Sequence, residues 1–281
     1  MIRFFFISRQ ETITFCDAIM QEGAKFQVQW KGDDQGGNQV SLIGEEWGEG
    51  EKDILVNILS ALVFKYRLPL WQNQLIRQKF YYQDEEEIHR IREICDWLND
   101  TKQRKKLGVR LPSLEDRIQT FVRNRIQFKS VVNFNEMMPF CFQHVRTLLL
   151  SYIGAALDEF KREEDYLLWV ESLRHYMQDK PSKVDELYLL QQSQLHYYSN
   201  EGKLLSKTEI KALLKKEPIR IFSGGIDDHS ITTALVYAPK RIYVYGDPAE
   251  PKIQTIINIF QERVICKPVH AFPFHHPAHI H

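Results

Sequence analysis

Histidine residues are concentrated at the end of the chain, and imidazole nitrogens are ligands that zinc and nickel prefer. Residues 270–281 contain His270, His275, His276, His279 and His281. Prolines interrupt regular structure in the same stretch, and chain termini are disordered by default. The pattern favours a flexible tail over a closed site, and the sequence leaves open whether the cluster binds a metal ion.

The segment Ser223-Gly224-Gly225-Ile226-Asp227 is similar to the Ser-Gly-Gly-X-Asp-Ser loop with which ATP pyrophosphatases hold pyrophosphate. It follows an expected strand at 219–222 and precedes an expected helix at 227–237, so backbone N–H groups could face a phosphate. Asp228 replaces the final serine and would place an anion there. We therefore favour a glycine turn with an aspartate capping the helix.

A basic segment runs from residue 102 to residue 129. Such a cluster could bind nucleic acid or anionic lipid. The acidic region 33–53 could instead neutralise it within the chain or across a dimer, and a solvated basic face is the commoner outcome. The basic residues are Lys102, Arg104, Lys105, Lys106, Arg110, Arg117, Arg123, Arg125 and Lys129, against Glu115 and Asp116.

The remaining reactive side chains form no recognisable catalytic set. The helical histidines lack the second ligand one turn away that a metal site needs. Adjacent carboxylates on a helix do not face one another, and the cysteines show no activating neighbour. We therefore predict no catalytic, cofactor-binding or metal-binding residue and no cofactor. The sequence favours a protein that is not an enzyme, and an enzyme of unknown class stays open because a site can assemble from residues distant in sequence. The residues considered are His89, His144, His175, Glu163-Glu164-Asp165, Cys141 and Cys266.

The elements that position these residues are organised around one long helical segment, 134–179. Val145, Leu149, Ile153, Ala156 and Phe160 recur every three or four residues, the spacing of one helix face. The pattern resumes after the polar stretch 161–165. We expect one long bent helix, or two helices with a polar joint at this stretch.

The flanking regions show different periods. Residues 3–44 read as a strand, a helix, and two strands joined by a glycine-rich turn, a β-α-β-β unit. Helices are expected at 51–64, ended by Pro69, at 71–80, at 85–98 after Asp84, and from Ser113 onward. Residues 186–198 predict a hairpin, a helix follows Ser206, and strands alternate with helices to residue 266, which favours a small parallel sheet.

These patterns predict an α+β fold with a helical middle and a mixed or parallel C-terminal sheet. The expected domains are an N-terminal α/β unit at 1–46, a helical region at 47–180, a C-terminal α/β region at 181–268, and a His-rich flexible tail at 269–281. A chain of 281 residues is long enough for one large or two ordinary domains.

Composition restricts the surroundings in which the chain works. Lys+Arg and Asp+Glu both number 37, so no global charge attracts nucleic acid or membrane. The four cysteines form no CxxC pair, which fits a reducing cytoplasm. The longest mostly apolar run, 148–157, is half the length of a membrane span, so we expect a cytoplasmic protein without one.

From about residue 128 to residue 266 the chain resembles the YtxC-like sporulation protein family of spore-forming bacteria. The matching pieces are Val132-Asn133-Phe134, Arg162-Glu163-Glu164-Asp165-Tyr166, Leu173-Arg174-His175-Tyr176-Met177, Asp227-Asp228-His229-Ser230-Ile231, Ala238-Pro239-Lys240-Arg241-Ile242, and the run from Thr255 to Cys266.

The resemblance implies a role in sporulation and no particular biochemical activity. Together with the missing catalytic set, it predicts a cytoplasmic protein that acts by binding another protein or by self-association. The alternative is a nucleic-acid or nucleotide-binding protein that uses the basic segment 102–129 or the turn at Ser223-Gly224-Gly225.

Overall fold

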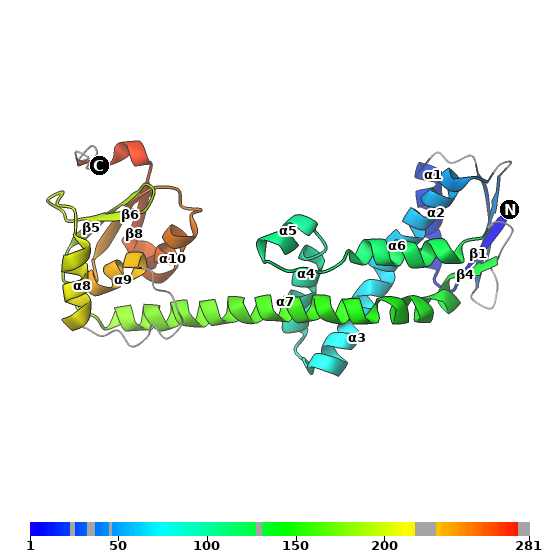
Figure 1. Ribbon diagram of the computed structural model, residues 1–281, viewed down its shortest axis with the longest axis horizontal. Helices are drawn as coiled ribbons and strands as arrows, with labels where there is room; N and C mark the ends of the chain where they lie inside the picture. Colours follow the sequence, from blue (N-terminus) through cyan, green and yellow to red (C-terminus); the bar gives the residue numbers. More distant parts are fainter. Residues whose placement is uncertain (23–25, 33–36, 45–46, 128–130, 217–228, 275–281) are drawn as a thin grey trace. The chain divides into compact units, whose positions relative to one another are not determined.

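The computed structural model describes residues 1–22, 26–32, 37–44, 47–127, 131–216 and 229–274. The chain divides into two compact units, Met1–Arg162 and Glu163–His281. Each unit combines a four-stranded sheet with helices, so the fold is α+β as predicted (Figure 1). The finer boundaries expected at residues 46, 180 and 268 stay predictions.

The sheet of the first unit has the strand order β2-β3-β1-β4. β1 (Ile2–Phe6) pairs antiparallel with β3 (Asn38–Ile43), which pairs antiparallel with β2 (Gln27–Gly32). Helix α1 (Arg9–Gln21) follows β1 and begins after Ser8, whose hydroxyl accepts a hydrogen bond from the Glu11 N–H at 3.3 Å. The predicted β-α-β-β unit is confirmed, and a fourth strand, β4 (Val131–Asn133), joins it in parallel with β1.

A continuous helical run follows β3 in the first unit. It comprises α2 (Glu49–Leu62), the π-helical segment η1 (Val63–Arg67) and α3 (Leu68–Phe80). The prediction that Pro69 ends a helix is wrong. Pro69 lies in the first turn of α3, directly after the wider π turn, where its missing N–H is tolerated.

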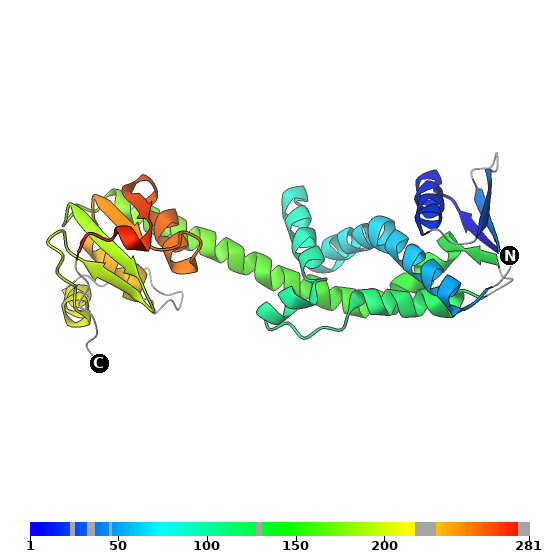
Figure 2. The same ribbon diagram turned by 90° about the horizontal axis from the view of Figure 1, so that it is seen from above.

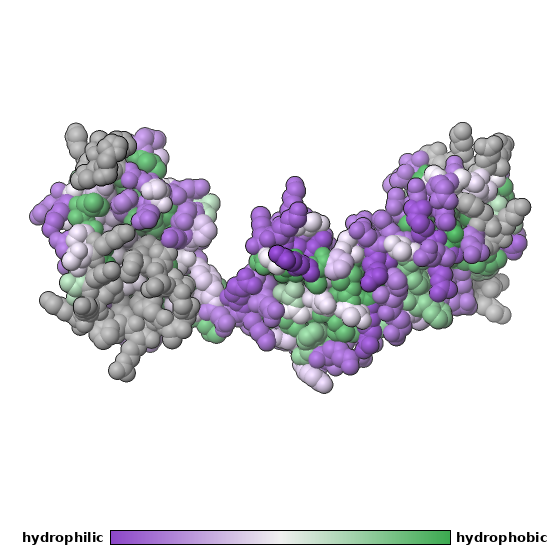
Figure 3. All heavy atoms as spheres, in the orientation of Figure 1, coloured by the Kyte–Doolittle hydropathy of each residue, from purple (hydrophilic) through white to green (hydrophobic). Residues whose placement is uncertain are grey.

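By length and composition this run of 32 residues, Glu49–Phe80, could cross a membrane. Half of its most apolar window is buried inside the structure. Its buried side chains belong to the core of the first unit. On the face drawn in Figure 3, the surface of this unit mixes hydrophilic and hydrophobic residues.

Three further helices precede the long one. α4 (Glu85–Trp97) is capped by Asp84 and α6 (Leu114–Arg125) by Ser113, as predicted. α5 (Thr101–Lys106) was not predicted. Helix α7 (Phe134–Gln178) is a single helix of 45 residues, and the polar stretch 161–165 is helical. The division between the two units falls within that stretch.

The sheet of the second unit has the order β6-β5-β7-β8. β5 (Glu186–Gln191) forms the predicted hairpin with β6 (Leu195–Tyr198), and β7 (Arg241–Tyr245) and β8 (Val264–Lys267) continue in parallel. The helices are α8 (Lys207–Lys216), α9 (His229–Tyr237) and α10 (Pro251–Phe260). The expected strand at 219–222 lies outside the described residues.

The core of the second unit lies on one face of its sheet. Side chains from the end of α7, from α9 and from α10 pack there against Leu187, Leu189, Ile242 and Val244. Figure 2 shows the strands of this sheet from above. The side chains on its opposite face form a separate, aromatic cluster.

Candidate binding groove at the edge of the first sheet

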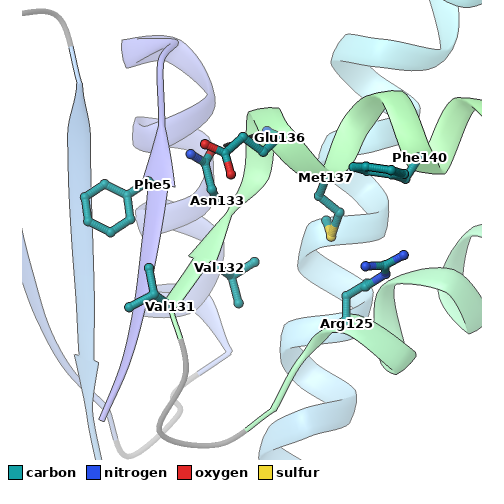
Figure 4. A pocket seen from close by; sticks show the side chains of 8 residues that line it. All are labelled: Phe5, Arg125, Val131, Val132, Asn133, Glu136, Met137 and Phe140. Atoms are coloured by element: carbon teal, nitrogen blue, oxygen red, sulfur yellow. Dashed lines mark hydrogen bonds between the residues drawn. The ribbon is translucent and has the colours of Figure 1, made fainter.

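A groove of about 560 Å³ lies beside β4, the last strand in the described order of the first sheet. Its lining comes from β1, β4, the end of α6 and the start of α7, segments far apart in the sequence (Figure 4). The lining residues are Phe5, Arg125, Val131, Val132, Asn133, Glu136, Met137 and Phe140.

The local sequence explains why a strand and a helix meet at this groove. Two β-branched residues, Val131 and Val132, favour extended backbone. Asn133 then ends the strand, and its side-chain oxygen accepts a hydrogen bond from the Glu136 N–H at 3.3 Å. This side-chain cap begins α7 immediately after the third strand residue.

The groove offers both apolar surface and charge. Val131 is 58% exposed and Phe140 is 60% exposed, although both are apolar. The Arg125 guanidinium lies 5.6 Å from the centre of the Phe140 ring, a cation–π contact. Glu136 supplies the opposite charge, and Figure 4 places it on the β4 side, away from Arg125.

A largely buried ion pair holds the first turn of α7, close to the groove in sequence. The Arg67 Nη2 group donates to Glu11 Oε2 and to Asn135 Oδ1, both at 2.8 Å. The guanidinium also lies 5.7 Å from the Phe134 ring centre. Arg67 ends the π segment, so this segment ties the first turn of α7 to α1.

Burial raises the pKa of Glu11, although the Arg67 charge and hydrogen bond oppose the shift. The side chain of Glu11 is 3% exposed and that of Arg67 is 22% exposed. The desolvation cost of a buried carboxylate therefore outweighs the favourable attraction to Arg67.

The predicted basic segment is divided among several structural tasks. Arg104 is 5% exposed and donates to the carbonyl oxygens of Leu98 and Asn99 at 2.7 and 2.8 Å. Arg123 forms an ion pair with Asp53 and a second one with Glu49 at 3.5 Å. Asp53 and Glu49 belong to the acidic region 33–53, which was expected to neutralise part of the basic segment.

The basic residues that stay exposed are Lys102, Lys105, Lys106, Arg110, Arg117 and Arg125, and Lys129 lies outside the described residues. The nucleic-acid alternative therefore depends on fewer charges than the sequence suggests.

The other candidate residues are not brought together. The expectation that the helical histidines lack a ligand one turn away is wrong for His89, because its Nε2 lies 3.4 Å from Oε1 of Glu93, four residues further on. The His144 ring packs 5.5 Å from that of Phe121. His175 is exposed on α7. Among the described residues, no three His, Cys, Asp or Glu side chains are placed to hold a metal ion.

Two candidate sites, for both of which the sequence favoured a structural interpretation, fall outside the described residues. These are the turn at Ser223-Gly224-Gly225 and the cluster of His275, His276, His279 and His281. His270 belongs to the short 3-10 turn η4 (Val269–Ala271).

The four cysteines are free thiols, and burial raises the pKa of each. For Cys141 the pKa rises to about 12. Cys266 is exposed and the other three are buried. None of the four is therefore activated as a nucleophile.

Sequence reasoning missed the groove because its defining strand has only three residues and pairs with β1 across most of the unit. The signal that could have found it is the pair of β-branched residues at 131–132, which lies just before the long helix.

Comparison with known proteins gives the class of protein. The chain matches the YtxC-like family over residues 53–265, more than half its length, and it belongs to that family. It is 29% identical over 119 residues to "Uncharacterized protein YtxC" of Bacillus subtilis (strain 168). The alignment covers 42% of this chain and 42% of that relative. No solved structure matches the chain.

Proposed function

We propose that this chain acts by binding another protein, which it holds as an extended segment along the outer edge of β4, the edge that pairs with no described strand. The groove beside β4 carries this proposal. A strand at the end of a sheet has backbone N–H and C=O groups that point away from its one neighbour. A peptide in extended conformation can pair with such an edge and place alternate side chains in adjoining pockets.

The lining of the groove indicates what such a segment carries. Apolar side chains would contact Val131 and Phe140, whose exposure in the free protein is 58% and 60%. Arg125 and Glu136 favour an acidic group at one end of the segment and a basic group at the other. The size of the groove, about 560 Å³, suits two or three side chains.

The setting that we propose is the cytoplasm of a sporulating cell. Resemblance to the YtxC-like sporulation proteins supports the sporulation context. The four free cysteines support a reducing compartment.

The test is an affinity pull-down from cells entering sporulation, with each sample divided into nuclease-treated and untreated halves. Wild type is compared with Val131→Asp and with Leu70→Asp, a matched control, because both residues are 58% exposed in the first unit and only Val131 lines the groove. Each recovered protein is then purified and titrated directly against the three chains.

A partner that survives nuclease, is lost with Val131→Asp and is kept with Leu70→Asp supports the proposal. A partner that both variants retain places the binding surface elsewhere. Partners that vanish with nuclease favour the nucleic-acid alternative, and replacement of Lys105 and Lys106 by glutamate should then abolish their capture.

A further inference from the structure

Tyrosine rings form a row across the second sheet, on the face opposite its helices. The register places Tyr198 of β6 beside Tyr188 of β5, and Tyr188 beside Tyr243 of β7. The Tyr188 and Tyr243 rings are stacked, with centroids 5.0 Å apart. Tyr245 lies two residues further along β7 on the same face.

The last described segment of the chain covers this row. The Phe272 ring packs edge-on to Tyr198 and Tyr245, at centroid distances of 5.0 and 5.2 Å. The Phe274 ring packs edge-on to Tyr188 at 5.0 Å. Tyr198 and Tyr245 are only 2% exposed as a result. Residues 272–274 therefore occupy this face of the sheet. We call the surface formed by Tyr188, Tyr198, Tyr243 and Tyr245 the tyrosine face.

The tyrosine face is shaped to fit its occupant. Gly202, at φ +77°, leaves space for the Phe274 ring, because a Cβ at this position would lie 2.7 Å from a ring atom. Glu186 accepts hydrogen bonds from the hydroxyls of Tyr188 at 2.7 Å and Tyr243 at 3.3 Å, which fixes both rings.

The occupying segment is held differently from a strand. Its contacts described with the sheet are ring contacts. Phe272 has φ −63° and ψ 126°, close to the polyproline conformation that a following proline imposes. A short Phe-Pro-Phe segment is therefore pre-organised and loses little entropy on binding. Any segment with the same chemistry can make the same contacts.

We propose that the tyrosine face is a recognition site for aromatic-Pro-aromatic segments of a partner protein, and that Phe272-Pro273-Phe274 occupies it as an internal competitor. The proposal is independent of the groove at β4, which lies in the other unit. A tethered competitor acts at an effective concentration on the order of 1 mM. A segment that binds the open face with a Kd of about 10 µM would therefore bind the covered face about 100-fold more weakly.

The experiment uses the full chain and a fluorescein-labelled peptide of sequence Val-His-Ala-Phe-Pro-Phe, followed by anisotropy. The open chain is Phe272→Ala/Phe274→Ala. The matched control is Leu167→Ala/Leu168→Ala, which removes two apolar side chains that are 64% and 68% exposed in the same unit. A second peptide with both phenylalanines replaced by alanine tests specificity.

The proposal requires the open chain to bind the aromatic peptide at least about tenfold more tightly than wild type does, with the control matching wild type. Equal binding by all chains, or no binding by an open chain that retains the wild-type circular dichroism, overturns it. If the double variant does not fold, Phe274→Ala alone is held to the same criterion. A wild-type dimer that dissociates in the open chain would assign the face to a second copy and would also overturn the proposal.

Discussion

Replacing Arg67 by methionine should destabilise the first unit far more than replacing Glu11 by glutamine. Loss of Arg67 leaves the Glu11 carboxylate, which is 3% exposed, without its counter-charge. Removing one partner of a buried pair costs about 3–5 kcal/mol. Arg67→Met also removes the hydrogen bond to Asn135, worth about 1 kcal/mol. We expect a total loss of about 4–6 kcal/mol.

Glu11→Gln should cost less than about 1 kcal/mol, because burial already disfavours the charged carboxylate. Arg67 is 22% exposed, so water can partly solvate the charge that remains. In the double variant, Glu11→Gln should recover a large part of the Arg67→Met loss.

The pH dependence gives a second check on this ion pair. Without Arg67, the pKa of Glu11 in the folded state rises further above its unfolded value. The folded state then binds a proton at pH values where the unfolded state does not, so stability increases as the pH falls through that folded pKa. The penalty of Arg67→Met should therefore be smaller at pH 5 than at pH 7.

Urea unfolding followed by tryptophan fluorescence measures these changes, because Trp30, Trp47, Trp71 and Trp97 lie in the first unit and only Trp169 lies in the second. Equal losses for the two single variants, or a larger loss for Glu11→Gln, would refute the reasoning. The reasoning would also be refuted if the double variant lost as much stability as the two single variants lose together.

Three further predictions follow from the contacts described. Arg104→Ala should destabilise the chain by about 2–4 kcal/mol, because it leaves buried carbonyl oxygens unpaired, whereas Lys105→Ala should change stability by less than about 0.5 kcal/mol in the same urea assay. A thiol reagent should label Cys266 in the native protein and reach the other three thiols only after unfolding. Mass spectrometry of the labelled peptides measures the order, and labelling of a buried thiol before Cys266 would contradict the prediction. Burial is the largest cause and the Glu186 hydrogen bond the second largest cause that raises the pKa of Tyr188 to about 12. Glu186→Gln should therefore lower that pKa without returning it to the ordinary value, and carbon NMR of the ring measures the change.

The sequence predicts those parts of the fold that depend on local pattern. The hairpin at 186–198 and the helices after Asp84 and Ser113 are found because periodicity and caps are local signals. Residues 161–165 are charged, but charged residues with long side chains are good helix formers, so α7 continues through them.

Features that depend on distant partners are missed. β4 is defined by its pairing with β1, in which Val131 lies opposite Arg3. No local pattern encodes a pairing between residues so far apart in the chain. Arg104 looks like one more cation in a basic run, yet the carbonyls that it satisfies make it a structural residue. In the sequence, Pro69 looks like the end of a helix. The π turn that lets the helix continue past it depends on how the whole run packs against the core, which no local pattern encodes.

Gly202 links two positions that are far apart in the chain, and this link can be followed across the YtxC-like family. Its positive φ alone would also tolerate asparagine, but a Cβ would collide with the Phe274 ring. Relatives that have an aromatic residue at the position of Phe274 should therefore have glycine at the position of Gly202. Relatives without that aromatic residue are free to have asparagine or aspartate there. The identity of a single turn residue would thus show, from sequence alone, which members of the family cover their own tyrosine face.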